Sequence, residues 1–288
     1  MKKIWIWGIS AVVLIILVGV TFMAINRNAS IANNPKHAKF IDSETPTLFL
    51  HGFGGSLNSV KFLVSQTEKQ GVTQEVITAH VDKNGAVTLK GQLTKKAINP
   101  IVQIELENNE ESNPKTNAEW FKNVIVALQK EYHFKNFNFV GHSMANMTFA
   151  QYMAMYGNDS SLPQLSKEVN IAGTFNGVLG INEEVNEITV NEDGKPSRMI
   201  PPYQDLQVLK SVYRGKNIEV LNIYGDLLDG SHSDGSVSVS SARSLKYLLG
   251  DSPKRYKESK YEGQTAQHSA LHENEKVATE LIQFLWHK

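Results

Sequence analysis

The feature that most restricts how this chain can fold is a short apolar strand that runs directly into a turn centred on serine. Residues Phe137 to Ala145 read FNFVGHSMA. Gly141 and Ala145, two positions before and after Ser143, are small, as a sharp strand-to-helix turn requires because those positions crowd together. A helix is expected to follow, with its first N–H groups aimed at negative charge that develops near the serine. The pattern predicts a nucleophile elbow.

The rest of the chain alternates apolar strands with helices, which predicts an α/β fold with a mainly parallel sheet and helices on both faces. Asn84-Gly85 predicts a hairpin, and Thr116 to Glu119 form a capping-box pattern at a helix start. Residues 177–213 break the alternation, either as a lid-like flap or as a surface excursion. The expected strands are 47–50, 76–81, 86–89, 102–106, 137–140, 169–172 and 218–224, and the expected helices are 59–70, 144–156, 240–249 and two that begin at 116 and 274.

A glycine-rich loop follows the first expected strand, where residues 51–55 read HGFGG. Such a loop can present a backbone N–H to an oxyanion, here the N–H of Phe53, with the N–H of Met144 as the second donor. The loop does not match a phosphate-binding loop, because no Gly-Lys-Ser/Thr follows it. We therefore expect an oxyanion hole between this loop and the serine turn.

A nucleophilic serine needs a base, and the base needs a group that orients it. After the strand at 218–224, the chain offers Asp226 and Asp234, and just before the last helix it offers His268 and His272. The order Ser, Asp, His is that of α/β-hydrolases. The two histidines lack the glutamate of a zinc-binding H-E-x-x-H helix, and the acids lack the spacing of a calcium-binding EF-hand. Neither a metal nor an organic cofactor is expected.

Five strings in order identify a resemblance that covers the chain from about residue 45 to its end. They are HGFGGS at 51–56, GHSMAN at 141–146, AGTFNG at 172–177, SDGSVSVSSA at 233–242 and HSALHEN at 268–274. The chain resembles the α/β-hydrolase superfamily and, within it, a family of cell-surface hydrolases of Gram-positive bacteria whose biochemical function is poorly defined. It is also similar to small bacterial lipases, although Ala145 stands where glycine is commoner.

The resemblance implies a serine hydrolase that acts on carboxylic esters, which can be lipid or acyl esters. It assigns Ser143 as nucleophile, Asp234 as acid and His268 as base, with Asp226 and His272 as reserve candidates. Thioesters and amides are alternative substrates for the same machinery. A surface binding module that keeps the fold without turnover is the alternative from another class.

The amino terminus predicts a membrane location. Residues 4–25 contain no charge and as a helix would span about 33 Å, enough to cross a bilayer core. Because Lys2 and Lys3 precede this run, the rest of the chain is expected outside the membrane. The predicted organisation is a signal anchor at 1–27, a tether at 28–43 and a hydrolase domain at 44–288. A cleaved signal peptide and a secreted protein form the alternative.

Composition narrows the partners of the chain. Lys plus Arg and Asp plus Glu both number 29 among 288 residues, so the net charge of zero removes the usual electrostatic reason to bind nucleic acid. There is no cysteine, which excludes a disulfide scaffold and a thiolate nucleophile. The expected partners are a small-molecule or lipid ester and, through the anchor, a membrane, and no oligomeric state is favoured.

Overall fold

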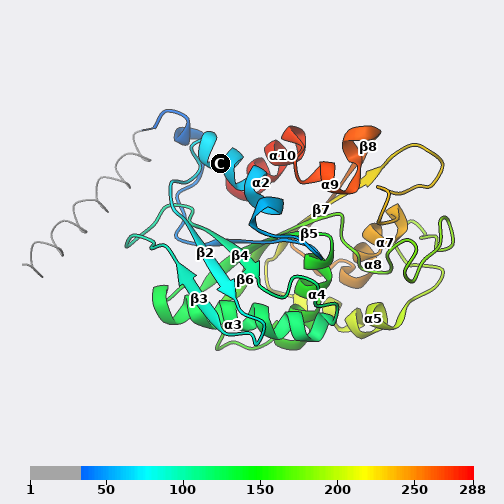
Figure 1. The fold of residues 1–288 in the computed structure, drawn as a ribbon, viewed down its shortest axis with the longest axis horizontal. Helices are drawn as coiled ribbons and strands as arrows, with labels where there is room; N and C mark the ends of the chain where they lie inside the picture. The colour runs from blue at the N-terminus through cyan, green and yellow to red at the C-terminus, as the bar shows by residue number, and fades with distance from the viewer. Residues whose placement is uncertain (1–33) are drawn as a thin grey trace, which may run out of the picture.

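A computed structural model describes residues 34–288, which form an eight-stranded sheet with helices on both faces (Figure 1). The strand order is β3-β2-β4-β1-β5-β6-β7-β8. Every neighbouring pair is parallel except β2 and β3, so the mainly parallel sheet is confirmed. The strands are β1 Thr47–Leu50, β2 Val76–Val81, β3 Val87–Lys90, β4 Ile101–Leu106, β5 Asn136–His142, β6 Gln164–Ile171, β7 Glu219–Asp226 and β8 Arg255–Glu262.

Two apolar cores lie on opposite faces of the sheet. Figure 1 shows α3 (Pro114–Tyr132) and α4 (Met144–Tyr156) on one face and α2 (Leu57–Lys69) and α10 (Glu275–Trp286) on the other. The side chains of β1 alternate between the two cores: Leu48 and Leu50 belong to the core under α3 and α4, and Phe49 belongs to the core under α2 and α10. This alternation follows the two-residue period of a strand that is buried on both faces. The helices are α2 Leu57–Lys69, α3 Pro114–Tyr132, α4 Met144–Tyr156, α5 Pro201–Gln204, α6 Leu209–Tyr213, α7 Val239–Arg243, α8 Leu245–Leu249, α9 His268–Leu271 and α10 Glu275–Trp286, with short 3-10 helices η1 His37–Lys39, η2 Asp205–Val208 and η3 Gln264–Ala266.

Most expected elements are present, two of them differ in detail, and one strand is additional. Helix α3 begins at Pro114 rather than at Thr116, because the Asn113 side chain accepts hydrogen bonds from the N–H groups of Lys115 and Thr116 and Pro114 fits the first turn. The helix expected at 240–249 is two short helices, α7 and α8. Strand β8 was not expected, because this edge strand reads RYKESKYE and has no apolar run.

The carboxyl end of the segment predicted as a tether, 28–43, packs on the domain. Phe40 is buried, it pairs with His287 in an isolated bridge, and the N–H of Ile41 donates to the carbonyl of Trp286. Burying a phenylalanine against α10 fixes this segment on the domain. The predicted anchor at 1–27 lies outside the described residues. Within residues 34–288, no helix is both long enough and apolar enough to cross a membrane.

The segment at 177–213 has two parts. Its second part, which contains α5, η2 and α6, packs into the core through Tyr203, Leu206 and Leu209. Its first part consists largely of turns and is joined to the loop after β7, because the N–H of Leu179 donates to the carbonyl of Ser236. This first part, about 178–199, contains no helix or strand, and its predicted role as a lid-like flap stays a prediction.

Candidate active site

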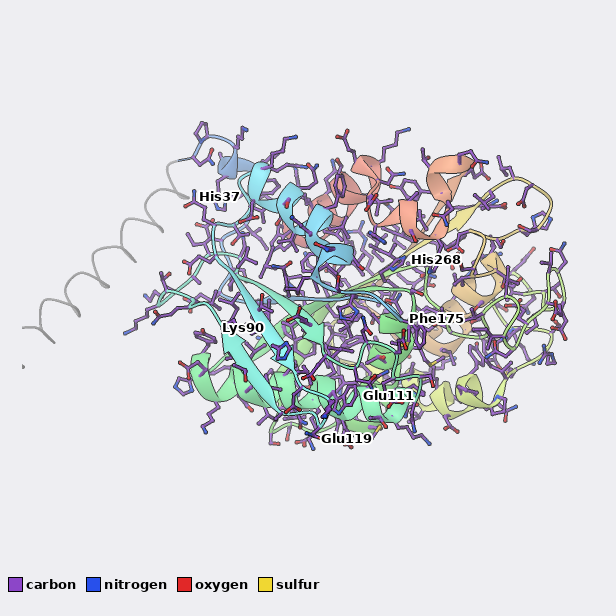
Figure 2. All side chains as sticks on the ribbon, viewed as in Figure 1. His37, Lys90, Glu111, Glu119, Phe175 and His268 are labelled. Atoms are coloured by element: carbon purple, nitrogen blue, oxygen red, sulfur yellow. The ribbon has the colours of Figure 1, made fainter. Side chains whose placement is uncertain are left out.

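The predicted site residues lie in loops that follow the carboxyl ends of parallel strands. Because β1, β5 and β7 are parallel neighbours or near neighbours, their carboxyl ends meet at one edge of the sheet. Strand β1 leads into the HGFGG loop, β5 ends at His142 just before Ser143, and β7 leads into the loop that carries Asp234. His268 lies at this end of the molecule, far from His37 near the start of the described chain (Figure 2).

Ser143 occupies a strained turn between β5 and α4. Its φ of 58° and ψ of −126° lie where residues other than glycine are rarely found. The Ser143 N–H donates to the carbonyl of Ile171 over 2.9 Å, which ties the turn to β6. Although Ser143 is the N-cap residue of α4, its side chain makes no capping bond. The hydroxyl is therefore left available for another partner.

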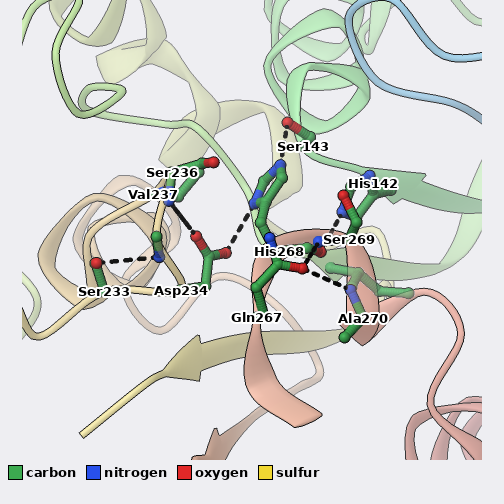
Figure 3. A network of polar contacts seen from close by, with 12 residues as sticks. His142, Ser143, Ser233, Asp234, Ser236, Val237, Gln267, His268, Ser269 and Ala270 are labelled. Atoms are coloured by element: carbon green, nitrogen blue, oxygen red, sulfur yellow. Dashed lines mark hydrogen bonds and ion pairs between the residues drawn. The ribbon is translucent and has the colours of Figure 1, made fainter. Parts of the chain in front are cut away.

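That partner is His268, which in turn contacts Asp234 (Figure 3). The Ser143 Oγ lies 2.9 Å from His268 Nε2, and His268 Nδ1 lies 2.8 Å from Asp234 Oδ2. With Nδ1–H donating to the carboxylate, Nε2 presents its lone pair to the serine hydroxyl. The arrangement can remove a proton from Ser143 and stabilise the imidazolium that forms.

Asp234 is held by its own loop. Its side chain is buried, and Oδ1 accepts hydrogen bonds from the N–H groups of Ser236 over 2.9 Å and Val237 over 2.7 Å (Figure 3). The backbone N–H of His268 also donates to the Asp234 carbonyl. These bonds leave Oδ2 for the imidazole, so the loop fixes which carboxylate oxygen meets the histidine.

The HGFGG loop lies directly against the serine. A Cβ added at Gly52 would come within 2.9 Å of the Ser143 Cβ, so only glycine fits there. Met144 is the first residue of α4, where N–H groups have no partner within the helix. Among residues 34–288, no protein group accepts a hydrogen bond from the N–H of Phe53 or of Met144. Both predicted oxyanion donors are free.

Two residues that sequence reasoning missed support this loop. The His51 ring is buried, and its Nδ1 lies 2.9 Å from the Gly52 carbonyl while its Nε2 accepts from the Leu106 N–H. Burial lowers the pKa of His51, which suits a neutral ring with one donor and one acceptor. Asn109 donates to the Gly55 carbonyl over 2.7 Å, although its stretch, ENNEE, reads only as a polar loop.

A cluster of three histidines was also unexpected. The His142 ring lies 4.7 Å from the His268 ring and 4.6 Å from the His272 ring, and His142 Nε2 donates to the His268 carbonyl over 3.0 Å. Burial, with His268 and His272 nearby, holds the pKa of His142 well below its ordinary value. The His142 ring is therefore neutral and packs against the rings of the other two histidines.

The two reserve candidates have other neighbours. Asp226 forms an ion pair with Lys260 over 2.8 Å, and its Oδ1 accepts from the Leu228 N–H. His272 packs on His142. In the part of the chain that the structure describes, neither residue hydrogen bonds to Ser143 or His268. No group of three or more histidine, aspartate or glutamate side chains in residues 34–288 is arranged to hold a metal ion.

Comparison with known proteins gives a consistent result. The family model described as "Alpha/beta hydrolase of unknown function (DUF915)" matches residues 34–288. The lin2722 gene product of Listeria innocua is similar, with a TM-score of 0.76 and 27% identity over 84% of this chain and 94% of that chain. The "putative cell surface hydrolase from Lactobacillus plantarum WCFS1" has a TM-score of 0.68 and 22% identity over 84% of this chain and 91% of that chain, which shows a shared fold. No curated protein matches.

Proposed function

The chain belongs to the DUF915 family of alpha/beta hydrolases, and we propose that it is a serine hydrolase that cleaves carboxylic esters. One observation carries the proposal: the unbroken series of short contacts from Ser143 Oγ through His268 to the buried carboxylate of Asp234. A buried acid and a matching motif could also occur in a binding module on the same scaffold. The series of contacts matches what acyl transfer requires.

In the proposed reaction, His268 Nε2 takes the hydroxyl proton of Ser143 as Oγ attacks the ester carbonyl carbon. The oxyanion accepts hydrogen bonds from the N–H groups of Phe53 and Met144. The imidazolium, oriented by Asp234, then gives its proton to the leaving alcohol, and an acyl-serine remains. Water attacks this ester with His268 again as base, the proton returns to Ser143, and the free acid departs.

The test is covalent labelling of the full chain with a fluorophosphonate. We expect the native protein to be labelled and Ser143→Ala to be unlabelled. Ser160→Ala is the matched control, because Ser160 is an exposed turn residue, and it should be labelled like the native protein. Equal labelling of Ser143→Ala would contradict the nucleophile assignment, and an unlabelled native protein would favour the binding module. A panel of esters, thioesters and amides, assayed with native protein that has not been treated with the probe, then ranks the substrate classes.

We further propose that the enzyme is anchored by residues 1–27 with its hydrolase domain outside the cell membrane. Two observations support this: the uncharged run at 4–25 and the description of the Lactobacillus plantarum protein as cell surface. In intact cells, a membrane-impermeant fluorophosphonate should label Ser143 as well as a permeant one does. Labelling by the permeant probe alone would place the site inside, and labelled protein in the medium would indicate cleavage and secretion.

A further inference from the structure

Asn146 contacts the serine turn without touching the hydroxyl. It lies in the first turn of α4 and is fully buried. Its Nδ2 donates to the carbonyl of Ser143 over 3.1 Å and to the carbonyl of Ile171 over 2.9 Å. The Ile171 carbonyl also accepts from the Ser143 N–H. One side chain thus links the strained residue to the end of β6.

The consequence lies in the peptide unit that joins Ser143 to Met144. A trans peptide is planar, and its C=O and N–H point in opposite directions. A group that holds the Ser143 carbonyl toward α4 therefore aims the Met144 N–H the other way, toward the space in front of the serine. We propose that Asn146 is a positioning residue whose amide fixes this peptide plane and so aims an oxyanion donor.

Two further observations favour this role over simple packing. The Oδ1 of Asn146 has no hydrogen-bond partner among residues 34–288, and an unpaired buried amide oxygen lowers stability. An apolar residue at this position would avoid that cost, so a role in stability alone does not explain an amide there. A Cβ at Gly141 would lie 2.6 Å from this Oδ1, so Gly141 leaves room for the amide as well as for the turn.

The inference rests on the proposed function, because an oxyanion donor matters only if an oxyanion forms. Losing one oxyanion donor costs about 10²–10³ in kcat in well-studied hydrolases. Asn146→Ala leaves the Met144 N–H in place, and the backbone N–H of Asn146 still donates to the Ser143 carbonyl over 3.1 Å. The variant therefore only loosens the direction of the Met144 N–H, and we expect a smaller loss of about 30-fold. The loss should fall on kcat with KM nearly unchanged, since the oxyanion exists only after attack.

The matched variant is Asn146→Ser. A serine in a helix can donate to the carbonyl three or four residues earlier, and the carbonyl three residues before position 146 is that of Ser143. Serine and alanine are close in size, so the pair differs chiefly in this donor. We expect Asn146→Ser to recover most of the activity that Asn146→Ala loses. If the alanine variant does not fold, Asn146→Cys, with a much weaker donor of serine-like shape, replaces it.

The experiment uses the full chain, with ester hydrolysis and the affinity for an alkylboronic acid as readouts. A boronic acid bonded to Ser143 forms a tetrahedral boronate, one oxygen of which takes the place of the oxyanion in the reaction intermediate. The proposal predicts that its affinity falls by about the same factor as kcat/KM in the alanine variant and returns in the serine variant. An unchanged boronate affinity in a folded alanine variant, or a loss confined to KM, overturns the role of Asn146 alone. A native protein that neither hydrolyses esters nor reacts with fluorophosphonate overturns the proposed function and this inference together.

Discussion

The sequence offers two aspartates and two histidines as partners for Ser143, and in the described residues only one aspartate and one histidine lie at the serine. Asp234 and His268 form a continuous contact with Ser143, whereas Asp226 and His272 do not. The two aspartates are equally buried, with exposed fractions of 1% and 2%. Each has a partner at 2.8 Å, but Asp234 faces an imidazole and Asp226 faces the ammonium of Lys260.

The difference shows that burial does not decide which acid contacts His268; the neighbouring side chain does. Lys260 lies on β8, the polar edge strand beside β7. Its ammonium group forms an ion pair with Asp226, the last residue of β7. Asp234 lies eight residues further along, in a loop whose N–H groups bind one carboxylate oxygen and leave the other free. The loop lets the acid reach His268.

Asparagine substitutions at the two acids give the sharpest test of this comparison. Asp234→Asn keeps the size of the side chain but offers an amide to His268 Nδ1, which favours the wrong imidazole tautomer. We expect kcat/KM for an ester substrate to fall by about 10³–10⁴, with Asp226→Asn as the matched control that stays within about twofold. A loss below tenfold at Asp234, or a large loss at Asp226, would reverse the assignment of the acid.

The fold could be predicted from the sequence where strands are buried on both faces. Residues 48–50 are all apolar, and so are five of the seven residues at 218–224, because both faces of a central parallel strand contact helices. Strand β8 has water on one side, and its side chains alternate in burial without an apolar run. Strand β8 pairs with β7 through backbone hydrogen bonds, which its polar side chains do not predict.

The candidate site also contains residues that could be predicted from the sequence and residues that could not. Ser143 could be predicted from local sequence, because the turn constrains its near neighbours. Asp234 and His268 were chosen over Asp226 and His272 by family resemblance, since nothing local separates them. The contacts of His51, Asn109 and Asn146 were missed, because each depends on a carbonyl brought close by the sheet or turn rather than on a pattern along the chain.

His272 offers a smaller test of the comparison. It packs on His142 rather than on Ser143, so we expect His272→Gln to lower kcat/KM by at most about tenfold. A loss equal to that of His268→Ala would instead identify His272 as the base. The two variants should be compared on the same ester with the same full chain.

His272 should also affect stability in acid. Burial, with His268 nearby, lowers the pKa of His272 in the folded protein below its ordinary 6.5. At pH values between this lower folded pKa and 6.5, the unfolded chain therefore binds more protons than the folded chain. The stability from the neutral ring is fully present above about 6.5 and is lost as pH falls toward the lower folded pKa. In urea titrations at about pH 7.5 and 5.5, the native protein should lose more stability on acidification than His272→Gln. An equal loss would show that His272 is not held neutral.

Asp226→Asn should have the smallest effect on activity and a distinct effect on stability. Burial by itself would raise the pKa of Asp226, but the hydrogen bond from Lys260, the Leu228 N–H and the charges of Lys260 and His232 together lower it below 3.8. The ionised acid therefore stabilises the fold above about pH 4, and this contribution disappears as pH falls through the lower folded pKa. Because Lys260 is partly exposed, we expect Asp226→Asn to lower the free energy of unfolding by about 1 kcal/mol at neutral pH. The gap between native and variant should therefore shrink as the pH falls below 3.8. A gap that widens in acid would mean that Asp226 is protonated in the folded protein. Its pairing with Lys260 would then not be what distinguishes it from Asp234.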